Sequence, residues 1–225
     1  MMRDPTTREA DRIRAYYAHA AWPASAGRDF LVAERRAALV ALLREHGANL
    51  RHITICDVGC GSGGDLLHWR SVGVAPQRLF GTELTPELAE AASTAVPGAS
   101  IARAAGFSIP FADESFDVVT LSLVLSSIRR SSERRALLAE ARRVTRRGGL
   151  TAIYDFRIRK PWNRRVVGIV PAEVRAALID AMSEQRLAPF LPALELCLRL
   201  PPTIGSTLIR WLPRTHRLWV CERRS

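Results

Sequence analysis

A glycine-rich turn directly after a hydrophobic segment holds the residues best suited to chemistry. Residues 53–64 read Ile-Thr-Ile-Cys-Asp-Val-Gly-Cys-Gly-Ser-Gly-Gly, an apolar run that ends in an acid and a turn. Glycines lack a Cβ atom, so backbone N–H groups and a helix N-terminus can approach a ligand closely there. This layout is typical of a nucleotide-type cofactor site after the first parallel strand of an α/β sheet.

The glycine spacing alone leaves the cofactor open, because Gly59, Gly61 and Gly64 also satisfy the dinucleotide pattern GxGxxG. Asp57 favours another ligand, since a carboxylate there repels a pyrophosphate but attracts an ammonium and a sulfonium. Glu83 ends the next hydrophobic segment and can accept both hydroxyls of a ribose, which either cofactor offers. The residues favour S-adenosylmethionine and keep an NAD-dependent oxidoreductase as an alternative.

The segments that must position these residues alternate between strand and helix patterns. We expect strands at 53–58, 78–82, 99–103, 116–124 and 150–156, and helices at 63–72, 86–95 and 132–146, the last ended by Gly148-Gly149. This order predicts an α/β fold, a doubly wound, mainly parallel sheet with helices on both faces. Two further helices, at 8–20 and 31–46, precede it.

The C-terminal part departs from this order. We expect a helix at 171–185, a strand at 193–199, a short helix near 204–212 and a last strand at 216–222. A short connection would let the two final strands pair as a hairpin.

Composition limits the class of protein. The 225 residues carry a formal net charge of +11, and Lys160 is the only lysine among 33 basic residues. An Arg-rich, Ala-rich chain often reflects GC-rich coding, so the charge is weak evidence for nucleic-acid binding. The four cysteines show no metal-like spacing, so no metal site is predicted and reduced thiols are expected. Without an apolar signal segment or a run of about 18 uncharged apolar residues, the chain is expected to be cytoplasmic, with no transmembrane segment.

Three segments together resemble a known family. They are 57–63 (Asp-Val-Gly-Cys-Gly-Ser-Gly), 109–119 (Ile-Pro-Phe-Ala-Asp-Glu-Ser-Phe-Asp-Val-Val) and 140–150 (Glu-Ala-Arg-Arg-Val-Thr-Arg-Arg-Gly-Gly-Leu). In order and spacing the chain resembles a class I S-adenosylmethionine-dependent methyltransferase, closest to the small-molecule branch that includes quinone-biosynthesis enzymes. The resemblance implies a Rossmann-like methyltransferase fold with seven strands, of which the last is antiparallel.

The resemblance also implies which residues contact the cofactor. Asp57 and the backbone of Gly59 and Gly61 would hold the methionine moiety, and Glu83 would hold the ribose. Cys60 would also contact the cofactor. The remaining contacts would be Leu84 on the adenine, Ala105, Gly106 and Phe107 along its edge, and Ser122 and Leu123 beside the transferred methyl group. Relatives often place an aspartate where Ala105 stands and a histidine where Ser127 stands, so this chain lacks both groups.

The N-terminal residues 1–50 are expected to form a helical lid over a core at 51–225, whose loops at 157–170 and 200–216 cover the substrate. Tyr16 and Tyr17 either close over the cofactor or pack between helices. His19 and Tyr17 are the candidate catalytic groups, and His216 is a weaker candidate base.

The acceptor is expected to be a small molecule. A basic cluster at 157–165 suggests an anionic one, and Trp22 and Trp162 a flat, aromatic one. The stripe of Ile204, Thr207, Leu208 and Trp211 either packs in the core, covers an apolar substrate or touches a membrane surface.

The sequence predicts methyl transfer to an oxygen, nitrogen or carbon atom in bacterial secondary or cofactor metabolism, with S-adenosylhomocysteine as product, by a monomer or homodimer. Two other functions remain open. A nucleic-acid methyltransferase would use the basic surface, but no Asn/Asp-Pro-Pro-aromatic motif or Pro-Cys pair is present. A non-catalytic binding module would bind the cofactor or a partner without turnover.

Overall fold

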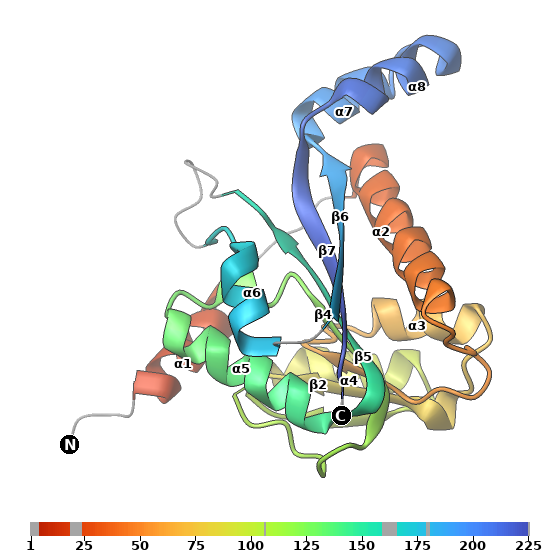
Figure 1. Cartoon of the computed structure of the whole chain (residues 1–225). Helices are drawn as coiled ribbons and strands as arrows, with labels where there is room; N and C mark the ends of the chain where they lie inside the picture. Colours follow the sequence, from red (N-terminus) through yellow and green to blue (C-terminus); the bar gives the residue numbers. More distant parts are fainter. Residues whose placement is uncertain (1–4, 19–23, 106, 159–165, 179–180, 225) are drawn as a thin grey trace.

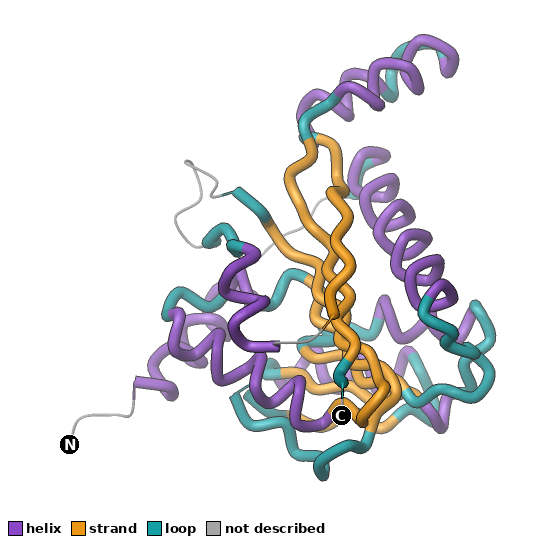
Figure 2. Tube along the Cα trace, in the orientation of Figure 1, coloured by secondary structure: helices purple, strands orange, loops and turns teal. Residues whose placement is uncertain are grey.

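The computed structural model describes residues 5–18, 24–105, 107–158, 166–178 and 181–224. At its centre lies a seven-stranded sheet of order β3-β2-β1-β4-β5-β7-β6 (Figures 1 and 2). The strands are β1 (Ile55–Val58), β2 (Leu79–Glu83), β3 (Ser100–Arg103), β4 (Phe116–Ser122), β5 (Thr145–Phe156), β6 (Ala181–Pro189) and β7 (Arg214–Glu222). Only β7 runs against its neighbours β5 and β6, so the expected mainly parallel sheet with an antiparallel last strand is confirmed.

Helices cover both faces of this sheet (Figure 1). The described helices are α1 (Pro5–Ala18), α2 (Ala26–Glu45), α3 (Gly64–Ser71), α4 (Pro86–Ala95), α5 (Ser131–Val144), α6 (Pro171–Leu178), α7 (Leu191–Cys197) and α8 (Pro202–Trp211), with short 3-10 turns η1 (Pro76–Arg78) and η2 (Leu125–Ser127). Of these, α7 and α8 lie beyond the ends of β6 and β7. None of the helices described is long and apolar enough to cross a membrane.

Alternation along the strands divides the core into two layers. On β5, Ala152 and Tyr154 face the layer of α2, α3 and α4, whereas Ile153 faces the layer of α5 and α6. Helix α2 adds Leu39 and Leu43 to the first layer.

Two predicted elements after β5 are wrong. The helix expected to reach residue 185 ends at Leu178, and residues 181–189 form β6 instead. The apolar run at 193–199, expected as a strand, lies mostly in α7, because Pro192 occupies its first turn and Leu194 and Cys197, three residues apart, share its buried side. The final strands do pair as an antiparallel hairpin, but the partner of β7 is β6, and α7 and α8 form the connection.

The role predicted for Gly148 and Gly149 is also wrong. Helix α5 already ends at Val144, and both glycines lie in the irregular start of β5. A Cβ atom on Gly149 would lie 2.9 Å from the carbonyl oxygen of Asp117. The glycine therefore allows β5 to approach β4 closely where their register shifts.

Candidate functional site

The glycine turn lies at the carboxyl end of β1, beside the end of β2. The N–H groups of Gly59 and Cys60 both donate to the carbonyl oxygen of Thr82, at 2.8 and 3.0 Å. Gly59 has a φ of +72°, and its Cβ atom would lie 2.8 Å from Cγ2 of Val124. Gly61 also has a positive φ, +55°, but nothing lies within 4 Å of its Cβ position. The turn therefore packs closely at Gly59 and leaves open space at Gly61, as a ligand-binding turn requires.

Glu83 at the end of β2 is tied to this turn. Its carboxylate accepts the N–H of Gly61 at 2.9 Å through Oε2 and the N–H of Thr85 at 2.9 Å through Oε1. Two oxygens with about four lone pairs between them keep further acceptor capacity after these two bonds. The carboxylate is thus held in a fixed orientation and can still accept ligand hydroxyls.

Asp57 lies on β1 below the turn and is buried. The hydroxyl of Thr120 donates to its Oδ1 at 2.7 Å. Burial above all, and then the charge of Asp65, raise the pKa of Asp57 to about 7. Arg35 cannot fully offset this effect, because its guanidinium forms two hydrogen bonds with Asp65. In the described structure Asp57 is an acid that lacks a directly bound cation.

Helix α1 docks on η2, just after β4. The Glu9 carboxylate accepts the N–H of Arg129 at 2.8 Å, and Arg12 donates to the carbonyl oxygen of Ser127. The hydroxyl of Tyr17 lies 2.9 Å from that of Ser127. Burial raises the pKa of Tyr17, so its hydroxyl stays protonated at neutral pH.

The tyrosine pair and the end of β4 meet near this contact. The rings of Tyr16 and Tyr17 lie edge to face with centroids 5.1 Å apart. Leu123, directly after β4, has a φ of +61°, and its N–H donates to the carbonyl oxygen of Tyr154 at 2.8 Å. A left-handed leucine is strained, and such residues concentrate at functional sites. Ser122 is half-buried opposite Tyr154.

Asp155, near the end of β5, is a fully buried acid behind η2. Its carboxylate accepts the N–H groups of Ser126 at 3.0 Å and Phe156 at 2.8 Å. Burial is the main reason that its pKa rises to about 6. The residue fixes the turn on which α1 docks, a role that no local sequence pattern indicates.

The predicted adenine edge follows β3. The N–H of Ala104 donates to the carbonyl oxygen of Glu83 at 3.0 Å, which places Ala105 beside the end of β2. Leu84 and Phe107 are half-buried.

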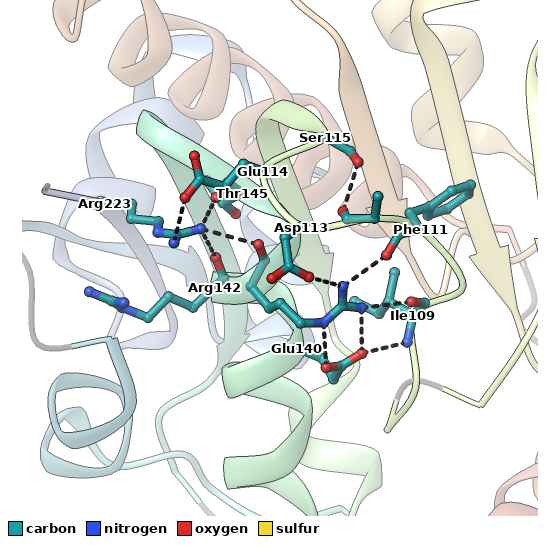
Figure 3. A network of polar contacts seen from close by, with 11 residues as sticks. Ile109, Phe111, Asp113, Glu114, Ser115, Glu140, Arg142, Thr145 and Arg223 are labelled. Atoms are coloured by element: carbon teal, nitrogen blue, oxygen red, sulfur yellow. Dashed lines mark hydrogen bonds and ion pairs between the residues drawn. The ribbon is translucent and has the colours of Figure 1, made fainter.

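The segment after Phe107 is held by α5 (Figure 3). Glu140 accepts the N–H of Ile109 at 2.9 Å, and Arg143 donates to the carbonyl oxygens of Ile109 and Phe111, each at 2.9 Å. Arg143 also lies 2.7 Å from Glu140, and this hydrogen bond is the main reason that the pKa of Glu140 is lowered. Glu140 and Arg143 belong to a segment that carries the family resemblance, so a signal for them was present although it assigned them no role.

Several candidates lie elsewhere. His216 is buried, and its ring stacks on Tyr154 with centroids 4.9 Å apart and 2° between the planes. Its Nδ1 lies 2.9 Å from the Thr215 hydroxyl, so its surroundings indicate packing rather than base catalysis. Five predicted features lie outside the described residues: His19, Gly106, Trp22, Trp162 and most of the basic cluster.

Known proteins support this assignment of the fold and domain. Residues 56–153 match a family described as a methyltransferase domain. The chain is 36% identical over 110 residues to an uncharacterized methyltransferase of Mycobacterium avium, and 35% identical over 113 residues to one of Mycobacterium marinum. These alignments cover 48% and 49% of this chain, and the chain spans only 41% and 42% of the relatives.

Solved structures resemble the whole chain at low identity. A geranyl diphosphate C-methyltransferase from Streptomyces coelicolor, crystallised with Mg²⁺, geranyl diphosphate and S-adenosylhomocysteine, has a TM-score of 0.68 at 16% identity, with 98% of this chain and 99% of that chain covered. A magnesium protoporphyrin IX methyltransferase from Synechocystis has a TM-score of 0.64 at 12% identity, with 95% and 97% covered. At such identities the likeness shows the fold alone. Strand order and these structural likenesses show the Rossmann-like methyltransferase fold, and within it residues 56–153 are similar to a methyltransferase domain.

Proposed function

We propose that this chain is an S-adenosylmethionine-dependent methyltransferase that acts on an oxygen, nitrogen or carbon atom of a small molecule. The buried Asp57 carries the proposal, because its carboxylate has a hydroxyl partner but no directly bound cation. The ammonium group of a methionine moiety would supply the missing positive charge. A dinucleotide pyrophosphate would instead add negative charge beside this acid.

The other residues of the turn fit the same ligand. The open space at Gly61 admits a ligand against the backbone, and the oriented carboxylate of Glu83 suits ribose hydroxyls. Gly59 and Cys60 would line the methionine moiety, and the half-buried Leu84 would lie against the adenine. Ala105, Gly106 and Phe107 would lie along its edge.

When bound, S-adenosylmethionine supplies an electrophilic methyl group on a sulfonium. The work left to the chain is to orient both reactants and to exclude water. Ser122 and the strained Leu123 would border the methyl group, and α1 would close over it as a lid through Tyr16 and Tyr17. The protonated Tyr17 would act as a hydrogen-bond donor, and a base, for which His19 is the candidate, matters only for a protonated acceptor.

The finer assignments rest on the sequence. We place the chain in the small-molecule branch with the quinone-biosynthesis enzymes and in the cytoplasm, as a monomer or homodimer. The core would extend over residues 51–225, with substrate-covering segments at 157–170 and 200–216, of which residues 202–211 are helix α8. The acceptor would be flat and aromatic, or anionic.

Calorimetric titration with S-adenosylhomocysteine tests the site. We expect binding by the wild type and a loss of at least about tenfold in Gly61→Arg, whose side chain would fill the open space, and in Glu83→Ala. Gly47→Arg is the matched control, because Gly47 also has a positive φ, +78°, and nothing within 4 Å of its Cβ position.

Circular dichroism confirms the fold of each variant. Binding by both site variants at wild-type strength would refute this location for the site. Equal losses of affinity in Gly61→Arg and Gly47→Arg would mean that backbone strain, rather than a filled ligand site, weakens binding.

The net charge of +11 supports one alternative to a small-molecule acceptor, in which the chain methylates RNA or another nucleic acid. Binding of RNA in a filter assay that weakens steeply with salt would favour it over the small-molecule proposal.

A further inference from the structure

Helices α7 and α8 carry an apolar outer face that none of the proposed cofactor contacts uses. The described residues expose eleven large apolar side chains, and six of them lie between residues 196 and 211: Leu196, Leu198, Leu200, Ile204, Leu208 and Trp211. Trp211 is 84% exposed and Leu196 63%. Single exposed apolar residues are ordinary, but such a concentration marks an interaction surface.

This outer face is not needed to build the hydrophobic core, because the inner face of the same two helices is already packed. Leu194, Cys197 and Ile209 form their own cluster, with Phe30 and Leu31 of α2 against it. A Cβ atom on Gly205 would lie 2.5 Å from the carbonyl oxygen of Cys197, so α8 is in close contact with α7. The helices cannot rotate their outer face inward without giving up this cluster.

The exposed large apolar residues of α8 form one stripe. Ile204, Leu208 and Trp211 are spaced by four and three residues, which places them on the same side of the helix. The two helices stand beyond the ends of β6 and β7 and beyond the start of α2, where they project from the molecule (Figure 1). A stripe of this kind on a projecting helix can lie flat in the interface of a bilayer, with tryptophan at the level of the headgroups.

The charges around the stripe indicate which kind of partner fits this surface. Between residues 190 and 214 the chain has three arginines, Arg199, Arg210 and Arg214, and a single acid, Glu195. Arg214 pairs with Glu34 of α2 at 3.2 Å, so Arg199 and Arg210 carry the charge argument. Glu195 is turned to α2, where it accepts the N–H of Gly27 at 3.1 Å. Arg199 and Arg210 are exposed. An apolar stripe beside arginines complements an anionic lipid surface, whereas a second copy of this chain would bring like charges together.

We propose that the outer face of α7 and α8 docks on an anionic lipid bilayer, with Ile204, Leu208 and Trp211 inserted at the headgroup level. The contact is peripheral and reversible, because one short helix face buries little area. The inference stands on the surface alone and does not depend on which methyl acceptor the site takes.

Vesicle flotation and tryptophan fluorescence test the proposal. The probes are vesicles of phosphatidylcholine alone and of phosphatidylcholine mixed equally with phosphatidylglycerol. We expect binding to the mixed vesicles, with a blue shift of tryptophan emission that is absent in Trp211→Ala, and weak binding to the neutral ones. Trp211→Ala and Leu208→Ser should each lower binding by about tenfold, and Arg210→Gln by about fivefold.

Two exposed residues elsewhere provide matched controls. Leu67→Ser on α3, where the side chain is 42% exposed, and Arg135→Gln on α5 should bind like the wild type. No binding to mixed vesicles, or equal losses in the controls, would overturn the proposal. So would light scattering that shows a dimer abolished by Trp211→Ala, since the occupant would then be a second copy. Calorimetry with S-adenosylhomocysteine should be unchanged in every variant, which separates this result from the cofactor proposal.

Discussion

Asp57 is an acid whose ionisation is set by residues distant in the sequence. Burial and the charge of Asp65 raise its pKa to about 7, while the hydrogen bond from Thr120 lowers it. Below that pH the free protein holds a proton on Asp57, and an ammonium ligand would have to displace it.

We therefore expect affinity for S-adenosylhomocysteine to fall as the pH drops from about 7 to about 5.5, by up to about tenfold per pH unit. Over this range the ligand's α-amino group stays protonated, so the ligand contributes no comparable change. Calorimetry in buffers of different ionisation enthalpy should show close to one proton released per ligand at pH 6. Asp57→Asn should bind weakly and almost independently of pH. A wild-type affinity that is flat over this range would contradict the pairing of Asp57 with an ammonium group.

At the scale of elements, polar contacts hold α1 against the segment that follows β4. Glu9, Arg12 and Tyr17 all reach residues 127–129. Beside these bonds the half-buried Ile13 packs against the core. We propose that the helix opens and closes as a lid about these contacts. Arg12 is the central residue, because it also forms two hydrogen bonds with Glu9.

Arg12→Gln should loosen α1 and weaken cofactor binding by roughly tenfold, about 1.5 kcal/mol for a charged hydrogen bond that is removed. Hydrogen exchange should show faster exchange in α1 and no change in α3 or α4. Arg14→Gln is the control on the same helix, because Arg14 pairs only with the exposed Asp11 in the described contacts. Equal effects of the two substitutions would mean that general loss of charge, rather than docking on η2, controls binding.

At the scale of the whole molecule, buried acids and acids paired with arginines change the stability of the fold with pH in opposite directions. Asp57 and Asp155 have raised pKa values in the folded chain, so between about pH 4 and pH 7 the folded state holds more protons than the unfolded state. Their contribution to stability is therefore lost as the pH rises through this range. Glu9 and Glu140 have lowered pKa values, and their contribution is lost as the pH falls below about 4.5.

The two buried acids should thus make the free energy of unfolding without ligand greatest near pH 5 and smaller at pH 8, by up to about 4 kcal/mol. The lowered pKa of His68 offsets part of this decline. Urea denaturation at a series of pH values measures it. Asp155→Asn should flatten the decline between pH 5 and pH 8, whatever its effect on stability itself. A stability that rises steadily from pH 5 to pH 8 would contradict the protonated state of both acids.

The sequence by itself determined the core between residues 53 and 156. Strand and helix periods, the glycine turn and the motif order are local signals, and they placed Asp57 and Glu83 at the ends of neighbouring parallel strands. The sheet, its helices and the Rossmann-like methyltransferase fold were predicted from them. The cofactor contacts assigned to Leu84, Ala105 and Phe107 stay predictions, because they follow from the family resemblance.

Only the tertiary structure decided the C-terminal third and the chemistry of the site. Residues 183–186, Ser-Glu-Gln-Arg, lack a strand pattern and are extended because β7 offers them a partner. The apolar run in α7 is helical because one side of it packs against α2. The proton on Asp57 depends on Asp65 and Thr120, 8 and 63 residues away, and the η2 turn depends on Asp155. Pairing, burial and electrostatic fields act through space, so local sequence patterns do not encode them.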